Sequence, residues 1–342
     1  AGRRLAPELR PWIGRTLGRH DRAVADVRRR FGPAVLGRGV LQLSGYLDLM
    51  LTSLLATGAV AGLLSAQMLY GLPVALFATS VAAASLPAMS RSTPSELAAT
   101  SLLARRRTAC FVAFSTVAFL VLGEPIVGAL FGWGAFDGDD ARAVALVLGA
   151  YAIGLPATAS SRIHQNTLFA MGDTAGPARI AAARVGLAAV VGLVLMFPLD
   201  RVTVHAGDLL TIGDHGWFGP LGQGIRSGSP DPHLGAVGLA LGSAMAAWIE
   251  LLLLARRTRG ALGVTSGPSS VMGPLVSPVA ASVVAAVAVH WLTDSLPDVA
   301  TAPISLVTAG TVYVTVAAAI GVSEAHDLLD ALRGAARRLL RR

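Results

Sequence analysis

Long runs of apolar residues, separated by short polar or basic segments, divide most of the chain. Eight runs are long enough to cross the ~30 Å hydrocarbon core of a bilayer as helices of about 20 residues. They are Phe31–Leu55, Ala61–Leu86, Thr108–Phe131, Ala141–Ala170, Ala178–Phe197, Gly235–Leu254, Val271–Leu292 and Pro303–Val322. Because a chain in lipid must pair its backbone polar groups internally, we expect an all-α, polytopic membrane protein with about eight transmembrane helices.

The composition agrees with this prediction. Of the 342 residues, 54% are hydrophobic and 14% are charged, and the mean hydropathy is +0.62. Soluble domains carry about 25% charged residues, so an ordinary soluble protein is excluded. The single cysteine, Cys110, excludes a disulfide framework and a cysteine-rich metal site.

The basic residues are distributed unevenly between the two sides of the predicted membrane. All 28 are arginine, and 22 of them fall on the side of residues 1–30, against three on the other side: Arg142, Arg201 and Arg226. Since cytoplasmic loops carry the excess of basic residues, we expect that first side, with both termini, to be cytoplasmic. The net charge of +8 then reflects topology, and no nucleic-acid partner is expected.

Basic segments flank the predicted spans at both ends of the chain. Residues 1–30 are predicted to be a cytoplasmic basic linker, and residues 323–342 a cytoplasmic basic amphipathic tail. In the tail, apolar residues recur at helical spacing among arginines: Leu328, Leu332, Ala335 and Leu339. This pattern is typical of helices that lie on an anionic membrane surface, so we expect anionic phospholipids of the inner leaflet as partners.

Polar side chains within the spans are the candidates for a binding site. A charge in hydrocarbon costs at least ~3 kcal/mol unless water, a ligand or another side chain meets it. Arg38, Gln42 and Asp48 fall within an arc of roughly 120° on the first span. Arg162 and Asn166 are four residues apart on the fourth span, hence on one face. A guanidinium can donate two parallel hydrogen bonds to a phosphate or carboxylate; the alternative is that these arginines satisfy carbonyls or reach the interface.

The other singled-out residues favour structural interpretations. Arg184 lies one to two turns from the predicted cytoplasmic end of the fifth span, which favours snorkelling to the interface. His164 is interpreted as a packing histidine, and Asp137-Gly138-Asp139 as a solvated turn of an outer loop. The sequence has no H-E-x-x-H, G-x-S-x-G or P-loop motif. We therefore predict no catalytic residues, no cofactor and no enzyme activity.

Several segments resemble motifs of the MurJ/MviN family of lipid II flippases. The similarity rests on Phe31–Gly37, Leu72–Phe77 with Leu86–Arg91, Gly123–Val127 with Leu130–Phe136, and Arg162–Ile163 with Leu168–Thr174 and Pro177. These segments occur in the family's order, each at the expected helix, and the resemblance covers about residues 20–325.

The resemblance implies a member of the multidrug/oligosaccharidyl-lipid/polysaccharide exporter superfamily, with two six-helix lobes around a central cavity. Residues 31–256 would form the second lobe, and residues 257–322 two additional helices that make a lipid-tail groove. The implied function is transport of lipid II, an undecaprenyl-pyrophosphate-linked peptidoglycan precursor, from the inner to the outer leaflet of the bacterial inner membrane by alternating access. The first lobe would then lie outside these residues, so we expect a fragment that does not transport alone.

The implied cavity residues are six polar side chains: Arg162, Arg38, Asp48, Gln42, Asn166 and Arg184. Asp48 is also a candidate for a sodium site, and no other metal site is expected. Met68 stands where the family often has an arginine, so no headgroup contact is expected there. Two alternatives stay open: a flippase for another polyprenyl-linked glycan, which Met68 favours, and a non-transporting scaffold for cell-wall enzymes.

The predicted topology can be tested by cysteine-accessibility labelling in intact cells. Cysteines at positions 138 and 215 should react with an impermeant reagent from outside, and a cysteine at position 257 only from inside. Labelling of position 257 from outside would overturn the topology.

Overall fold

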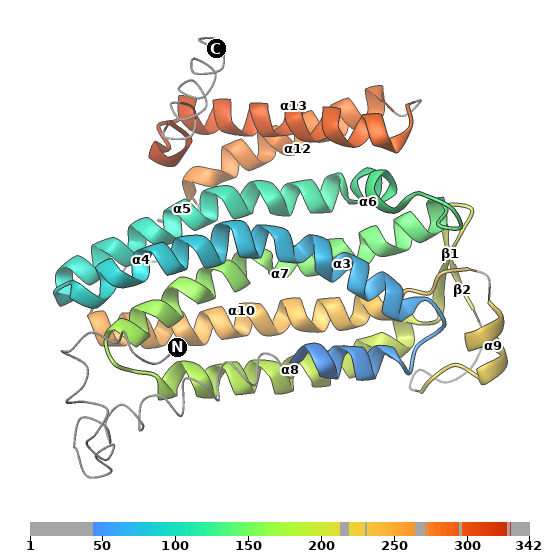
Figure 1. Ribbon diagram of the computed structural model, residues 1–342, viewed down its shortest axis with the longest axis horizontal. Helices are drawn as coiled ribbons and strands as arrows, with labels where there is room; N and C mark the ends of the chain where they lie inside the picture. Colours follow the sequence, from blue (N-terminus) through green and yellow to red (C-terminus); the bar gives the residue numbers. More distant parts are fainter. Residues whose placement is uncertain are drawn as a thin grey trace, which may run out of the picture.

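The computed structural model is a bundle of long helices (Figure 1). The structure describes residues 44–212, 219–229, 231–263, 271, 273–293, 296–326 and 329. Arg38, Gln42, the predicted linker 1–30 and most of the predicted tail 323–342 lie outside these residues, and so does the first half of the first predicted span.

Helices account for almost all of the described elements. In chain order they are a helix over residues 44–52, α3 (Ala59–Pro73), the π-helix η2 (Val74–Thr79), α4 (Ser80–Arg91), α5 (Pro94–Val121), α6 (Gly123–Phe131), α7 (Gly138–Ala170), α8 (Ala175–Leu199), strands β1 (Val202–His205) and β2 (Asp208–Thr211), α9 (Gln223–Gly228), α10 (Gly235–Leu262), the short 3₁₀-helix η3 (Gly273–Leu275), α12 (Val276–Leu292) and α13 (Asp298–Ala319). Within the described residues, six helices are long and apolar enough to cross a membrane, or seven if α5 and α6 count as one span. The predicted all-α membrane fold is confirmed.

The second predicted span is a helix that changes its winding near its middle. Pro73 has no backbone N–H to donate, and the six residues that follow form the π-helix η2 between α3 and α4. The hydroxyl of Ser80 donates to the carbonyl of Ala75 at 3.0 Å, which satisfies one acceptor of this widened turn. Such π-helical insertions are often found at functional positions in helices.

The third predicted span, Thr108–Phe131, differs most from the structure. The helix α5 begins much earlier, at Pro94, where Thr93 and Glu96 form a capping box. It ends at Val121, and α6 continues at an angle of 78°. Gly123 and Pro125 directly follow the break, and neither favours the interior of a continuous helix. The predicted span Thr108–Phe131 is therefore a bent pair of helices rather than one continuous helix.

The most buried helix is α7, which lies at the centre of the main hydrophobic core. Its inner face packs against α3, α5 and α10 through large apolar side chains, among them Leu148 and Leu155 from α7, Leu63 from α3 and Val112 from α5. On one side of α7 lie α10 and then α8, and on the other lie α5 and the pair α12–α13 (Figure 1).

Small residues allow α8 and α10 to approach until their backbones touch. A Cβ placed on Gly242 of α10 would lie 2.5 Å from the nitrogen of Gly192 and 2.9 Å from the carbonyl oxygen of Ala188, both on α8. A Cβ on Gly238 would lie 2.6 Å from the carbonyl carbon of Leu195. Because lipid supplies no hydrophobic driving force between helices, such close packing is a main source of helix association in membranes.

The long outer connection contains a small β-hairpin that the sequence analysis missed. Strands β1 and β2 pair antiparallel, with Val202 opposite Thr211. Asp139, at the start of α7, accepts hydrogen bonds at 2.8 Å from the backbone N–H groups of Ala206 and Gly207 at the hairpin turn. Asp137 caps the N-terminus of α7. Asp139 therefore connects α7 to the hairpin, whereas Asp137 and Gly138 are exposed, as expected for a solvated turn.

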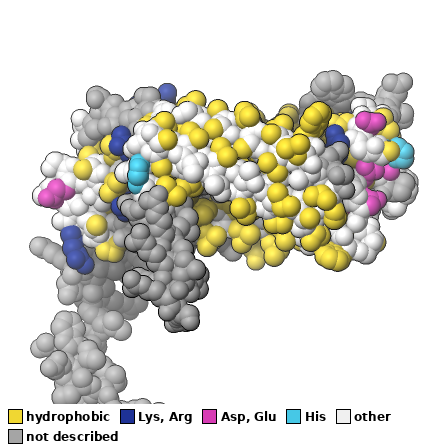
Figure 2. Space-filling model, turned by 90° about the horizontal axis from the view of Figure 1, so that it is seen from above, with side chains coloured by type: hydrophobic (Ala, Val, Ile, Leu, Met, Phe, Trp, Pro, Cys, Tyr) yellow, Lys and Arg dark blue, Asp and Glu magenta, His cyan; other side chains and the backbone are white. Residues whose placement is uncertain are grey.

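The surface agrees with a protein that is embedded in lipid. In Figure 2, hydrophobic side chains cover the middle of the visible face, and most of the charged ones lie at the two ends of the molecule. The segments at one end carry Arg91, Arg179, Arg256 and Arg257, and those at the other end carry Asp137, Asp139 and Asp140.

Gly242→Ala is expected to destabilise the protein by ~1–3 kcal/mol, because the new methyl group overlaps the backbone of α8. Unfolding by denaturant in mixed micelles measures the change. The matched control is Gly260→Ala, on the same helix with no atom within 4 Å of the new Cβ, which should not lower stability. Equal effects of the two substitutions would show that the contact between α8 and α10 contributes nothing.

Candidate functional site

Polar side chains from five helices gather within the apolar bundle. We call Asp48, Tyr70, Arg162, Arg184 and Glu250 the inner polar cluster; they come from helix residues 44–52, α3, α7, α8 and α10, respectively. The charges of Arg162, Arg184 and Glu250 all act on the phenol of Tyr70, and the charge of Arg184 acts on Asp48. These residues therefore belong to one electrostatic environment, although they are far apart in sequence.

The centre of the cluster is an ion pair between α8 and α10. Arg184 Nη1 donates to Glu250 Oε2 at 2.7 Å, and the side chains are 16% and 0% exposed, respectively. Gln165 of α7 donates to the other oxygen of Glu250 at 3.0 Å. Both oxygens of a buried carboxylate are thus satisfied, as its burial requires. The snorkelling predicted for Arg184 was wrong, because its guanidinium turns to a partner inside the bundle.

Hydrogen bonds between tyrosines and their partners connect α3 with α7 beside this pair. Tyr70 donates to the hydroxyl of Thr158 at 3.0 Å, and Gln67 donates to the phenol oxygen of Tyr151 at 2.9 Å. The two tyrosine rings lie 5.2 Å apart between centroids. These hydrogen bonds satisfy the polar atoms of two tyrosines whose rings belong to, or pack against, the main hydrophobic core between α3 and α7.

The two site residues predicted on α7, Arg162 and Asn166, have different surroundings. Asn166 donates to the backbone carbonyl of Ala82 in α4 at 2.7 Å, so its amide holds two helices together. Arg162 is partly exposed and faces the region of Tyr70 and Arg184. Asp48 is likewise partly exposed, and its charge acts on Tyr151. The structure brings Asp48, Arg162 and Arg184 together, while Arg38 and Gln42 lie outside the described residues.

The sequence analysis assigned no role to Glu250, Tyr70, Gln67 and Gln165. A usable signal existed for Glu250, which is an acidic residue within the apolar run Gly235–Leu254 and needs a partner there. No comparable signal marks the tyrosines, because a tyrosine in a span is ordinary at either interface. His164 is buried, with its Nδ1 3.2 Å from the hydroxyl of Thr258, in agreement with a packing role.

No metal centre is evident in the part of the chain that the structure describes. Within those residues, no group of three or more histidine, cysteine, aspartate or glutamate side chains is arranged to hold an ion. Hard cations are also bound by backbone carbonyl and hydroxyl oxygens, which are not members of such a group. The sodium site at Asp48 therefore stays a prediction.

An apolar groove lies beside α13. It is lined by Phe77 of η2, by Phe111 and Phe114 of α5, and by Tyr313 and neighbouring residues of α13. The rings of Phe77 and Phe111 stack with centroids 5.0 Å apart. Tyr313 donates to the carbonyl of Cys110 at 2.6 Å, so its polar atom is satisfied and its ring is presented to the groove. We call this feature the α13 groove.

Comparison with known proteins gives a consistent result. The family model described as "Lipid II flippase MurJ" matches residues 10–210. The chain is 26% identical over 192 residues to a probable lipid II flippase MurJ of Rickettsia prowazekii (strain Madrid E), covering 55% of this chain and 38% of that protein. It is 29% identical over 193 residues to the corresponding protein of Rhizobium tropici, covering 54% and 35%.

A solved structure shows the same fold. "Lipid II flippase MurJ, inward closed conformation" superposes with a TM-score of 0.63 at 20% identity, covering 87% of this chain and 54% of that chain. The sequence matches span less than two fifths of the length of the first two relatives.

Removing one partner of the ion pair between Arg184 and Glu250 should destabilise the protein. Glu250→Leu leaves the partly buried charge of Arg184 uncompensated, so we expect a loss of ~3–5 kcal/mol in the free energy of unfolding in micelles. Adding Arg184→Met to that variant should recover most of the loss. The control Arg257→Ala removes the exposed pair with Asp173 and should cost less than ~1 kcal/mol. A double variant as unstable as Glu250→Leu would contradict the assignment.

Proposed function

The chain belongs to the lipid II flippase MurJ family, and we propose that it forms the second lobe of a transporter that moves lipid II across the bacterial inner membrane by alternating access. The match of the family model to more than half of the chain is the observation that carries this proposal. In it, the helix over residues 44–52 with α3–α10 forms the lobe, and α12 and α13 are the two additional helices. The product would serve peptidoglycan biosynthesis.

The inner polar cluster supports a role in contacting the headgroup. A pyrophosphate carries negative charge and many acceptor oxygens, which arginine recognises well with its forked donors. Arg184 already binds the fully buried Glu250, so it serves mainly to hold the cluster together. Arg162, which is partly exposed at the edge of the same cluster, is our first candidate for contact with the substrate. Asp48 faces the same region and would set the local charge.

The α13 groove supports a role in holding the lipid tail. Its lining of stacked phenylalanines and a satisfied tyrosine offers apolar surface along α5 and α13. A polyprenyl chain gains roughly 0.025 kcal/mol for each Å² of apolar surface that it removes from water, but much less against lipid, so the groove would guide rather than trap it.

The arginine distribution supports the orientation that we propose. The end that carries Arg91, Arg105, Arg179 and Arg257 would face the cytoplasm, with both termini on that side. In this orientation the inner polar cluster would lie within the membrane and the β-hairpin on its outer side.

One observation favours a second candidate, the transport of another polyprenyl-linked glycan. Met68, at the position where the family often has an arginine, is 69% exposed on α3. A thioether cannot replace a cation toward a pyrophosphate, so the headgroup would be held differently from that side of the lobe.

Arg162 is expected to be needed for transport. Arg162→Ala should lower rescue of cells that are depleted of their own flippase and express this chain together with a first lobe, because it removes a charge-assisted contact worth ~1.5–3 kcal/mol. Arg162→Lys should restore part of the activity as a point charge without the fork. Growth and membrane levels of the protein are measured together.

Arg91→Ala, at an exposed position at the end of α4, is the matched loss of charge and should rescue fully. Full rescue by Arg162→Ala, or loss of the protein from the membrane, would assign a structural role to Arg162. Rescue by the 342 residues without a first lobe would contradict the two-lobe proposal.

A further inference from the structure

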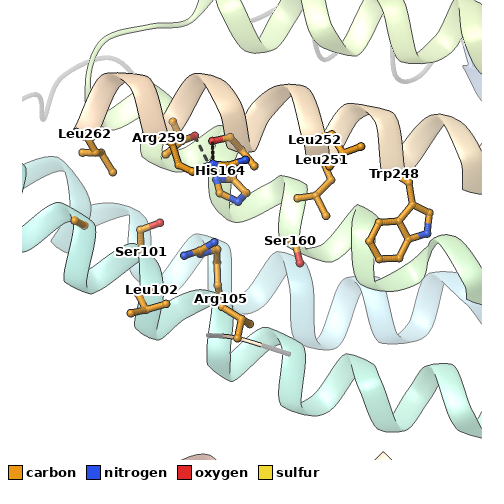
Figure 3. A pocket seen from close by; sticks show the side chains of 14 residues that line it. Ser101, Leu102, Arg105, Ser160, His164, Trp248, Leu251, Leu252, Arg259 and Leu262 are labelled. Carbon is orange, nitrogen blue, oxygen red and sulfur yellow. Dashed lines mark hydrogen bonds between the residues drawn. The ribbon is translucent and has the colours of Figure 1, made fainter. Parts of the chain in front are cut away.

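A second groove lies on other faces of α7 and α10 than the inner polar cluster. Residues of α5, α7 and α10 line it (Figure 3), together with Val271. We call it the α5–α10 groove. Its lining residues are Ala98, Ser101, Leu102, Arg105, Ser160, His164, Trp248, Leu251, Leu252, Ala255, Thr258, Arg259, Leu262 and Val271.

Helical geometry separates this groove from the inner polar cluster. On α7, Ser160 is two residues from Arg162, a rotation of about 200° around the helix. On α10, Trp248 is likewise two residues from Glu250 and points about 200° away from it around the helix. Each helix therefore presents one polar face to the inner cluster and a different face to the groove, so the two sites do not share a cavity.

The groove contains positive charge without a counter-charge. Arg105 from α5 and Arg259 from α10 both line it, and each lies within electrostatic range of the other. Among the residues described, the groove lining includes no carboxylate. The nearest acids in the sequence are engaged elsewhere: Glu96 accepts hydrogen bonds from Thr93, and Glu250 is paired with Arg184.

Among the groove-lining residues that the structure describes, Arg105 carries a buried polar atom without a partner. Its Nε is buried and has no hydrogen-bond partner within the described part of the chain. Figure 3 shows this side chain extending from α5 toward α7 and α10, below His164. A buried donor without an acceptor costs about 1–3 kcal/mol, so a small shift of this side chain that lets it donate to an anion in the groove is favoured. Ser101 adds a hydroxyl on the same face of α5.

The length of the groove matches one leaflet of a bilayer. From Arg259 to Trp248 the lining follows α10 for 11 residues, which is about 16 Å along the helix axis. Half of the ~30 Å hydrocarbon core is nearly the same length. Beyond the arginines the lining of α10 is apolar, with Leu251, Leu252 and the ring of Trp248, whose Nε1 already donates to the carbonyl of Ile153.

We propose that the α5–α10 groove binds an anionic phospholipid of the cytoplasmic leaflet, with its phosphate between Arg105 and Arg259 and one acyl chain along Leu251, Leu252 and Trp248. The inference depends on the proposed orientation of the chain in the membrane but not on lipid II transport. The occupant is an anionic lipid rather than a soluble anion because cationic and apolar lining follow each other over the length of one leaflet.

Quenching of Trp248 fluorescence by brominated acyl chains tests the proposal. The protein, with its other four tryptophans replaced by phenylalanine, is placed in nanodiscs of phosphatidylcholine that contain a small fraction of brominated phosphatidylglycerol or brominated phosphatidylcholine. Brominated phosphatidylglycerol should quench Trp248 at a mole fraction about tenfold lower than brominated phosphatidylcholine does. One charge-assisted hydrogen bond to the lipid phosphate region accounts for a factor of that size in affinity.

Matched variants identify the groove as the site of selectivity. Arg105→Ala with Arg259→Ala should abolish the preference for phosphatidylglycerol. Arg107→Ala with Arg256→Ala removes the same charge from exposed positions of the same helices outside the groove, and should leave the preference intact. Circular dichroism shows that each variant is folded.

Three results would overturn the proposal. One is equal quenching by the two brominated lipids in the unmodified groove, which would show that it does not select an anionic lipid. Another is loss of the preference in the control pair as well, which would assign it to general surface charge. The third is removal of the preference by millimolar inorganic phosphate, which would mean that the groove binds a soluble anion.

Discussion

The absence of water in the hydrocarbon core is the constraint from which the arrangement of this protein follows. A buried charge must be met by another side chain, a ligand or water, and in the centre of the bundle Arg184 and Glu250 meet each other, with Gln165 as a further donor. The three residues come from α8, α10 and α7, so their contacts determine how these helices are rotated against one another. The rotation in turn decides which face of α7 carries Arg162 and which carries His164.

The sequence predicted the class of fold because that class depends on local composition. Apolar runs of about 20 residues and the uneven distribution of arginines are visible without knowledge of the packing. The break at Leu122 was missed for a local reason, since Gly123 and Pro125 lie in a run that is apolar throughout and hydropathy does not register a turn. The hairpin β1–β2 was missed because strands of four residues in a long connection have little periodicity.

The site was less predictable because it depends on contacts between distant residues. Asp48, Arg162 and Arg184 were recognisable as charges in apolar runs, but their roles were not. Arg184 and Glu250 are 66 residues apart in sequence, and only the packing of α8 against α10 brings them together. Arg105 and Arg259 are further apart still, and each taken alone is an ordinary basic residue near the cytoplasmic end of a helix.

The contact between Gly192 and Gly242 has a mechanical consequence. At this contact the two backbones touch, and no side chain lies between them. A change of side-chain rotamer therefore cannot let one helix slide along the other there. We therefore expect α8 and α10 to move as one rigid pair, which the ion pair between Arg184 and Glu250 also holds together. Any bending of the lobe has to occur where the chain is compliant, and the loosened winding of η2 after Pro73 is such a place. A movement started there would change the angle between α3 and α4, while α8 and α10 keep their positions relative to each other.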